Sequence, residues 1–330
     1  MRSVTRTAAL GHRLAVNGLT GSRVSRSRLA EAARPGLQDG SPRSGLLSLA
    51  ARVDAVQPHD WRDPGLKQVF GPRGAIYLVP QEDVGIFTLG LLPRDPSRIE
   101  RLRHLEQTVH RILDDGPIRQ TDLVAALPEI EDSRELRWAS TLGTILPVWD
   151  TVDTIVHPGP PPVIDPEEAR RELARRFFRY IGPATVADLQ WWCNGSRADA
   201  NVTAEAIAGD LNELLVDGRQ CQVTAPFTDA GPDPDAVLLL PPDDPYINRK
   251  TRDILLPEPT TRRLLWPQAP PPGALVIGGE IAGTWRRRAT TVEFTPWCHV
   301  APEHRAAAEG TAAAWPLGET PGAIKWNPPA

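Results

Sequence analysis

Cysteine and methionine are scarce in this sequence of 330 residues, which contains three cysteines and one methionine. Cys193, Cys221 and Cys298 stand far apart, form no Cys-x-x-Cys pair and have few histidines nearby. A disulfide framework or a structural zinc site requires closer or more numerous partners. We therefore expect a reduced, cytoplasmic protein with no bound metal.

Long apolar runs are also missing, and none approaches the roughly 18 residues that a membrane-spanning helix requires. The basic start, residues 1–16, lacks the continuous apolar stretch of a secretion signal. The motifs Gly-x-Ser-x-Gly, Gly-x-x-x-x-Gly-Lys-Ser/Thr and His-Glu-x-x-His do not occur. A membrane protein, a secreted protein, an acyl hydrolase, a P-loop nucleotide hydrolase and a zinc protease all lack sequence support.

Acidic residues are absent before Glu31, whereas six arginines occur in that stretch. Residues 1–111 carry 17 Lys and Arg against 10 Asp and Glu, and residues 112–235 carry 10 against 22. The positive charge is therefore concentrated at the front of the chain. Such a block suits a polyanion, because Lys and Arg bind phosphates and release counterions. An ordinary solvated basic terminus remains the alternative.

An internal repeat divides the chain, since GPIRQTDL at 116–123 returns as GPATVADL at 182–189. Each copy follows an amphipathic helical pattern, over 102–113 and over 167–178. Glycine in a left-handed conformation and proline are expected to end that helix, and Thr121 or Thr185 to lie near the start of the next. A third helix, over 134–146 or 203–216, then runs into a short β-like stretch. This order is typical of a winged helix, a helix-turn-helix module that can enter a DNA groove.

The second and third units carry net negative charge, so a role as protein–protein spacers stays open for them. A basic face on the first helix of the third unit favours DNA binding instead. It is formed by Arg170, Arg171, Arg175, Arg176 and Arg179.

Beyond Pro226 the pattern changes to alternating β-like runs, with Gly278-Gly279 as a type I′ hairpin signal. The runs expected to form strands are 237–240, 264–266, 274–277, 280–285 and 291–294. Thirty-five prolines and 26 glycines agree with many short elements. We predict an α+β protein with three tandem winged-helix units followed by a small antiparallel β domain. The predicted boundaries are 1–100, 101–165 and 166–227 for the units, 236–300 for the β domain and 301–330 for a helix with a packed or trailing tail.

Two stretches near the front carry a family resemblance: GLQDGSPRSGLLSLAAR at 36–52 and RGAIYLVPQED at 73–83. They resemble the N-terminal signature of the AlkZ-like, YcaQ-type winged-helix DNA glycosylases. The two Gly-Pro repeats, Asp-Pro-Tyr at 244–246 and Gly-Thr-Trp-Arg at 283–286 resemble later landmarks of that family. The likeness spans residues 10–300, and the order of the motifs makes it specific.

This resemblance implies a monomer that wraps double-stranded DNA and hydrolyses the N-glycosidic bond of alkylated purines, including crosslinked ones, without a metal or an organic cofactor. In the family, two polar side chains at alternate positions orient the attacking water. Gln38 matches the first, whereas the second falls on Gly40, which has no side chain. Asp39 is a candidate substitute only if a local bulge turns it toward Gln38. Tyr77 replaces a family histidine.

The candidate catalytic residues are thus Gln38 and Asp39. The candidate DNA contacts are Arg43, Arg52 and Arg73 near the front, and Arg286 and Arg287 at the end of a predicted strand, where a solvated strand end is the alternative. Two further classes of function stay open: a dimeric transcription factor or scaffold that binds DNA without chemistry, and an interaction module that ignores DNA. For a repair enzyme we expect a location with the nucleoid in the cytoplasm.

Three other motifs have a functional and a structural interpretation, and the structural one is favoured for each. His59-Asp60-Trp61 and Asp243-Asp244 are interpreted as turns, in which aspartate accepts backbone hydrogen bonds. Trp191 and Trp192 are expected to pack in the core of the third unit rather than to stack on bases.

Overall fold

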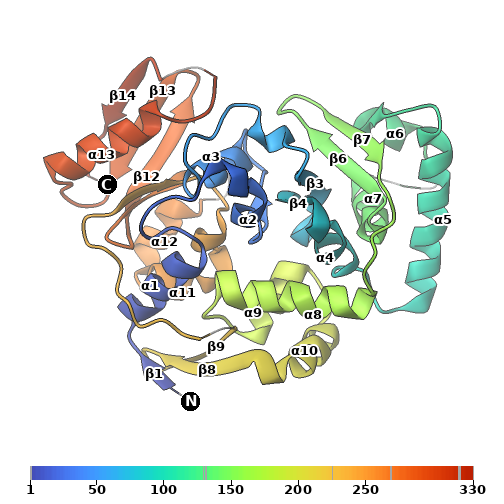
Figure 1. Cartoon of the computed structure of the whole chain (residues 1–330), viewed down its shortest axis with the longest axis horizontal. Coiled ribbons are helices and arrows are strands. Elements are labelled where there is room, and N and C mark those ends of the chain that lie inside the picture. Colours follow the sequence, from blue (N-terminus) through green and yellow to red (C-terminus); the bar gives the residue numbers. More distant parts are fainter. Residues whose placement is uncertain are drawn as a thin grey trace.

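The fold combines short helices with four small sheets. A computed structural model describes residues 2–128, 130, 132–224, 226–267, 270–318 and 321–329. Three of the described sheets have three strands and one has five (Figure 1). The predicted mixture of helices with small, mainly antiparallel sheets is therefore confirmed. No helix within the described ranges combines the length and the apolarity needed to cross a bilayer.

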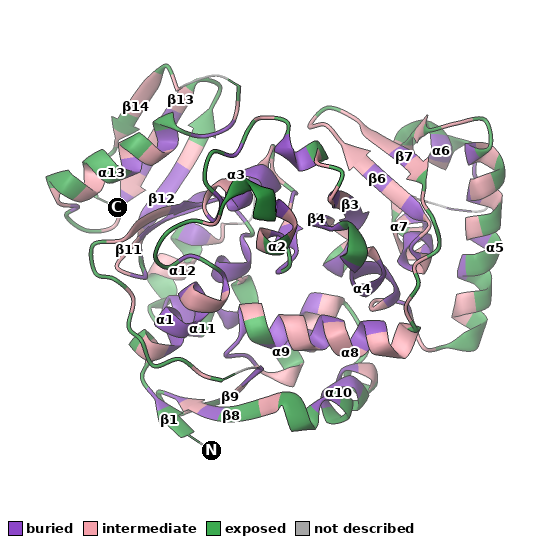
Figure 2. Ribbon diagram, in the orientation of Figure 1, coloured by how far each residue is buried: buried purple, intermediate pink, exposed green. Residues whose placement is uncertain are grey.

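The central sheet holds the segment with the family signature. Its strand order is β2–β4–β3, all antiparallel, and Gln38 lies opposite Tyr77. Leu29, Leu37, Leu49 and Leu78 form the core beneath it, and all four are buried. Figure 2 shows the burial of each part of the chain, with buried segments in purple. The elements of this part are α2 (Leu29–Ala32), β2 (Leu37–Gln38), α3 (Ser44–Ala50), β3 (Leu66–Phe70), β4 (Ile76–Pro80) and α4 (Val84–Leu89).

The second part begins with the longest helix, α5 (Pro96–Leu113), which contains the predicted helix over 102–113. Asp95 caps it, and Pro96 occupies the first helical position. The predicted helix over 134–146 is shorter than expected, because Gly143 adopts a left-handed conformation with φ of 89° and residue 145 starts a strand. The other elements are β5 (Ile118–Arg119), α6 (Gln120–Ala125), α7 (Ser133–Ala139), β6 (Ile145–Trp149) and β7 (Thr154–Pro158).

The third part repeats the order of helices and hairpin with two differences from the prediction. Gly182 is extended, with φ of −61°, and not left-handed. The single helix predicted over 203–216 is wrong, because residues 211–216 form a strand that pairs on both edges, and this tertiary pairing outweighs the helical spacing of its leucines. The elements are α8 (Pro166–Arg176), α9 (Val186–Cys193), α10 (Arg197–Ala206), β8 (Leu211–Val216) and β9 (Arg219–Thr224).

The two copies of the repeat differ at the cap of their second helix. The Thr185 hydroxyl accepts the Asp188 backbone N–H, and the Asp188 carboxylate accepts the Thr185 N–H, which is a full capping box. Thr121 lies inside α6 and caps nothing. Thr185→Ala is therefore expected to lower the free energy of unfolding by about 1 kcal/mol, as measured by urea denaturation. Thr121→Ala is the matched control, and an equal loss in both variants would contradict the capping argument.

The start of the chain packs against the third part and the β domain. Strand β1 (Arg2–Val4) pairs in parallel with β8, and Leu10 and Leu14 of α1 (Arg6–Val16) share a core with Leu214 and Val276. Residues 2–19 thus contribute to a core different from that of the central sheet, although the predicted unit 1–100 included both.

The β domain is a five-stranded sheet in the order β10–β11–β12–β13–β14. The strand predicted over residues 264–266 is wrong. Pro259 starts a helix that extends to Leu265, and the Leu265 side chain is buried. Part of the expected tail, 323–326, is a strand that pairs in parallel with β13. The elements are β10 (Val237–Leu240), α11 (Arg252–Leu255), α12 (Pro259–Leu265), β11 (Gly273–Ile277), β12 (Glu280–Arg288), β13 (Thr291–Pro296), α13 (Pro302–Ala313) and β14 (Ala323–Trp326).

Candidate functional site

Gln38 lies at the end of β2, where successive side chains alternate between two sides of the backbone. Leu37 and Asp39 are buried, whereas Gln38 is half-buried and Gly40 is exposed. A Cβ atom at Gly40 would lie 3.2 Å from Nε2 of Gln38. Positions 38 and 40 therefore share one face, as the period of two in a strand requires.

Gln38 lines a cavity of about 310 Å³. Its walls come from the central sheet, from α9 and from the loop after β10, which lie far apart in the sequence. The side chains that line it include two amides, two guanidinium groups, one phenol, two indoles and one carboxylate. The polar and aromatic lining residues are Gln38, Arg73, Tyr77, Trp191, Trp192, Asp243, Asn248 and Arg249.

Tyr77 fixes the orientation of the Gln38 amide. The Tyr77 hydroxyl donates to Oε1 of Gln38 at 3.2 Å, which leaves the Nε2 donor on the side of Gly40. Burial raises the pKa of the Tyr77 phenol well above its usual range, and the negative charge of Asp243 raises it further. Tyr77 therefore remains a neutral hydrogen-bond donor at physiological pH.

Asp39 points away from the cavity. Its carboxylate accepts hydrogen bonds from the Gly45 backbone N–H at 2.9 Å and from Nε2 of Gln68 at 2.8 Å, and the residue is 1% exposed. No bulge turns it toward Gln38. The proposal that Asp39 substitutes for the missing side chain at Gly40 is therefore corrected: Asp39 holds the start of α3.

Arg73 and Trp191 form one wall of the cavity. The Arg73 guanidinium lies 4.0 Å from the centre of the Trp191 ring, and Lys250 lies 4.9 Å from the same ring. Trp192 is buried in the core, as predicted for both indoles, but Trp191 is only half-buried. Adjacent positions on a helix point about 100° apart, so Trp192 can face the core while Trp191 lines the cavity. The spacing in the sequence does not show which of the two indoles does which.

Asp243 and Asp244 have different environments. Asp244 is a buried turn residue whose Oδ1 accepts the Tyr246 backbone N–H at 3.0 Å, as the sequence predicted. Asp243 lines the cavity with a left-handed φ of 63° and keeps an exposed surface. Because the cavity walls displace water around its carboxylate, the pKa of Asp243 is raised, and Arg249 opposes that shift.

The sequence matches a family model described as DNA glycosylase AlkZ-like over residues 35–315. The chain belongs to the AlkZ-like DNA glycosylase family. Among solved structures it is similar to Streptomyces sahachiroi DNA glycosylase AlkZ, with a TM-score of 0.76 and 19% identity over 99% of this chain and 100% of that chain. The comparison with curated proteins finds no match. The resemblance drawn from residues 36–52 and 73–83 is thus confirmed.

Arg52 is not available to DNA in this AlkZ-like chain. It is 2% exposed and forms a two-pronged ion pair with the buried Asp244, at 2.8 and 2.9 Å. Its Nε and Nη1 also donate to the backbone oxygens of Asn17 and Ser48. The prediction of a phosphate contact is therefore wrong, because Arg52 joins α1, α3 and the loop after β10.

Arg43 also has partners within the protein. It donates to the backbone oxygens of Trp149 and Asp150 and lies 3.9 Å from the centre of the Trp61 ring. This arginine joins the central sheet to the β6–β7 hairpin. The neighbouring Asp60 accepts hydrogen bonds from Arg26 and from the Gln57 backbone, so the predicted turn at residues 59–61 is confirmed.

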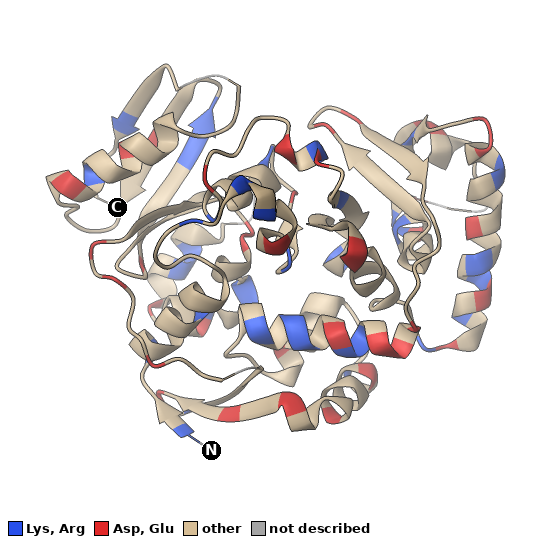
Figure 3. Cartoon of the chain, in the orientation of Figure 1, with Lys and Arg blue, Asp and Glu red and all other residues tan. Residues whose placement is uncertain are grey.

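The amino-terminal arginines do not form one open cationic surface. Arg2 and Arg6 pair with Asp229 and Glu280, and Arg13 is buried and donates to backbone oxygens. Four of the five arginines of the predicted basic face lie on α8 and pair with acidic residues, and blue and red residues intermingle along this helix (Figure 3), whereas Arg179 lies beyond α8 and is exposed. The pairs that the arginines of α8 form are Arg170–Glu167, Arg171–Glu168, Arg175–Asp210 and Arg176–Asp83.

Arg286 and Arg287 lie beside a second cavity, of about 560 Å³, between β12 and the loop after Gln38. Arg287 is exposed, whereas Arg286 is half-buried and donates to the Pro270 oxygen at 2.9 Å. Ser41 and Pro42, just after the Gln38 segment, line the same cavity. Both arginines line this second cavity, Arg287 with an exposed side, and they stay candidates for phosphate contact.

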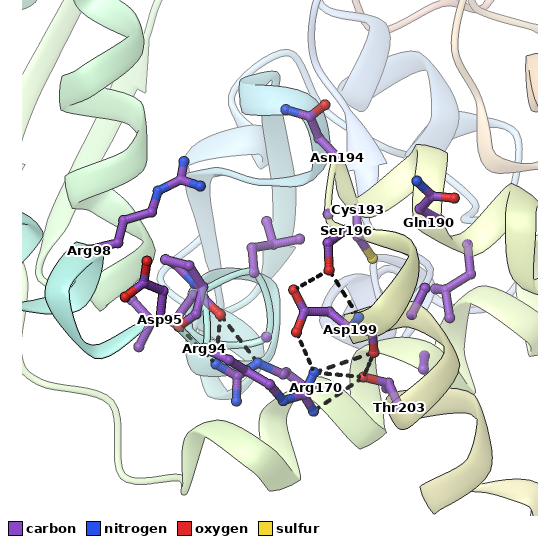
Figure 4. A pocket seen from close by; sticks show the side chains of 18 of the residues that line it. Arg94, Asp95, Arg98, Arg170, Gln190, Cys193, Asn194, Ser196, Asp199 and Thr203 are labelled. Carbon is purple, nitrogen blue, oxygen red and sulfur yellow. Dashed lines mark hydrogen bonds and ion pairs between the residues drawn. The ribbon is translucent and has the colours of Figure 1, made fainter.

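A third cavity, of about 360 Å³, separates the second and third parts (Figure 4). Among the residues that line it, Arg94 pairs with Asp199 and with Glu167 nearby, and Arg170 donates to the Leu92 oxygen. These contacts tie the start of α5 to α8 and α10. We interpret this cluster as a structural connection.

Proposed function

We propose that this protein is a DNA glycosylase that hydrolyses the N-glycosidic bond of an alkylated purine in double-stranded DNA. The observation that carries the proposal is the Gln38 amide, held by Tyr77 in the wall of a cavity that Trp191 and Arg73 also line. The cavity volume of about 310 Å³ lies near the lower end of ligand sites, which span roughly 300–1,000 Å³. A single flipped base is a ligand of this kind.

The chemistry requires little assistance. An alkylated purine carries a positive charge and is a good leaving group, so the protein must position water and stabilise charge at the sugar. The indoles of Trp191 and Trp192 give the cavity an aromatic lining for the base, and the Gln38 amide offers a fixed dipole at the cavity wall. No group of metal-binding side chains occurs among the described residues, and the proposed step needs none.

The three helical parts are proposed to act as winged-helix units that hold the duplex, with Arg73, Arg286 and Arg287 as phosphate contacts. A protein that wraps one lesion works as a monomer, and we propose that state and a location with the nucleoid. The test is release of 7-methylguanine from a methylated duplex, run beside binding to undamaged and abasic duplexes. Slow release that depends on the protein, with preference for the abasic duplex, supports the proposal.

A non-enzymatic DNA-binding protein is the second candidate. Gly40 favours it, because glycine supplies no second polar side chain to orient water. Retention of the undamaged duplex with no release of any alkylated base would support this function. Light scattering and one footprint separate the two, because a regulator is usually a dimer on paired half-sites.

Restoring a polar side chain at position 40 is expected to accelerate base release. Gly40→Gln places a second amide beside Nε2 of Gln38 on the exposed face of the segment, where the flexible Gln38 side chain can adjust. We expect a rise of about tenfold in the single-turnover rate, which corresponds to about 1.4 kcal/mol. Gly209→Gln, at an open position that does not line the cavity, is the control. An unchanged rate in Gly40→Gln would show that this face does not meet the sugar.

A further inference from the structure

The proposed hydrolysis needs a group that accepts a proton from the attacking water, and the residues of the sequence signature do not supply one. A glutamine amide is not a base at neutral pH, and Oε1 of Gln38 already accepts from Tyr77. Gly40 has no side chain, and Asp39 faces the interior. Gln38 can therefore orient a water molecule but cannot take its proton.

Asp243 is the only carboxylate among the described residues that line this cavity. It lies across from the central sheet, at the start of the loop that follows β10, and its charge acts on the Tyr77 phenol that holds Gln38. Its exposed surface leaves it reachable from the cavity.

The backbone holds Asp243 firmly in place. The next residue, Asp244, is fixed by Arg52, by the Ser48 hydroxyl at 2.7 Å and by the Tyr246 N–H. Asp243 itself has φ of 63°, a left-handed conformation that costs free energy for residues other than glycine and that aspartate and asparagine tolerate best. Such strain persists only where the surroundings impose it, and it gathers at functional sites.

We propose that Asp243 is the general base of this site, a catalytic residue that takes over the task for which Gly40 has no side chain. The inference rests on the proposed function. The bond between C1′ of the sugar and the ring nitrogen of the alkylated purine breaks, and its electron pair stays on the departing base. The oxygen of water forms the new bond to C1′, its proton passes to the Asp243 carboxylate, and the carboxylate returns that proton to solvent.

The ionisation of Asp243 gives the reaction a pH dependence of known sign. The charged groups that face it in the cavity are Arg73 and Arg249, and Tyr77 is neutral. Water displacement raises the pKa of Asp243 above its ordinary value, while Arg249 limits the shift. Because the base must be ionised, the rate is expected to fall as the pH falls through this raised pKa, at a higher pH than for a solvated aspartate.

The test compares Asp243→Asn with wild type in single-turnover release of 7-methylguanine and in binding to an abasic duplex. Asparagine has nearly the same shape and tolerates the left-handed φ, so folding and duplex binding should persist. We expect a loss of about a hundredfold in rate, since general base catalysis contributes at least that much, together with loss of the acidic limb of the pH profile. Asp217→Asn is the matched control, because Asp217 is also exposed, has φ of 45° and lies at the tip of the β8–β9 hairpin.

A rescue arm adds Gly40→Asp to the Asp243→Asn variant and is expected to restore part of the rate and the acidic limb. An active wild type whose Asp243→Asn variant keeps the full rate and the same pH profile overturns the role of Asp243 alone. A wild type that releases no alkylated base overturns the proposed function, and the catalytic role of Asp243 with it.

Discussion

Arg52→Ala is expected to lower the free energy of unfolding by about 3–5 kcal/mol, the usual cost of breaking a buried ion pair. The substitution leaves the carboxylate of Asp244 1% exposed with its charged partner removed. It also deletes the N–H groups that satisfy the backbone oxygens of Asn17 and Ser48. Because total stabilities are about 5–15 kcal/mol, a loss of this size is evident in urea or thermal denaturation.

Arg28→Ala is the matched control for this prediction. Arg28 also pairs with an acidic residue, Glu31, but both side chains are about half exposed, so water replaces the lost partner. No measurable shift in the unfolding midpoint is expected for this variant. If Arg52→Ala unfolded at the same urea concentration as wild type, the interior pair would contribute nothing, and the three segments that it joins would be held by apolar packing alone.

Gln38→Ala is expected to reduce the single-turnover rate of base release by about 10²–10³-fold, the range observed when one positioned polar group is removed from an active site. The variant removes the amide and also leaves the Tyr77 hydroxyl without its acceptor inside the cavity. Binding to an abasic duplex is expected to change far less, since the substitution leaves the three arginines proposed to contact phosphates in place.

Gln57→Ala controls for the loss of a glutamine, because Gln57 is exposed and its amide donates only to the Ala55 oxygen. Release of 7-methylguanine at the wild-type rate by Gln38→Ala would place the chemistry outside this cavity. It would also remove the main support for the proposed function.

Sequence reasoning located the near wall of the cavity. Residues 36–40 and 73–77 carry a recognisable order of motifs, and the alternation of a strand correctly separates Gln38 and Gly40 from Asp39. The far wall could not be predicted. Trp191 and Asp243 line the same cavity as Gln38 only because of tertiary packing. No spacing in the sequence predicts that residues more than 150 positions apart lie around one cavity.

The roles of the arginines show the same limit. A count of charges reveals a positive surplus in residues 1–111, but it does not show that Arg13 and Arg52 are buried. Likewise, leucine spacing over 211–216 fits a helix until β1 and β9 are available as neighbours on either side. In both cases the deciding partners come from distant parts of the chain.

The parallel pairing of β1 with β8 imposes an order on biosynthesis. Val4, Leu10 and Leu14 find their apolar neighbours only when the segments around residues 214–276 have left the ribosome. At about 5–20 residues per second, the first helix therefore waits for roughly 10–50 s with its apolar side uncovered. During that interval the nascent chain exposes apolar surface that chaperones bind, and this part of the fold is complete only when β8 has been made and pairs with β1.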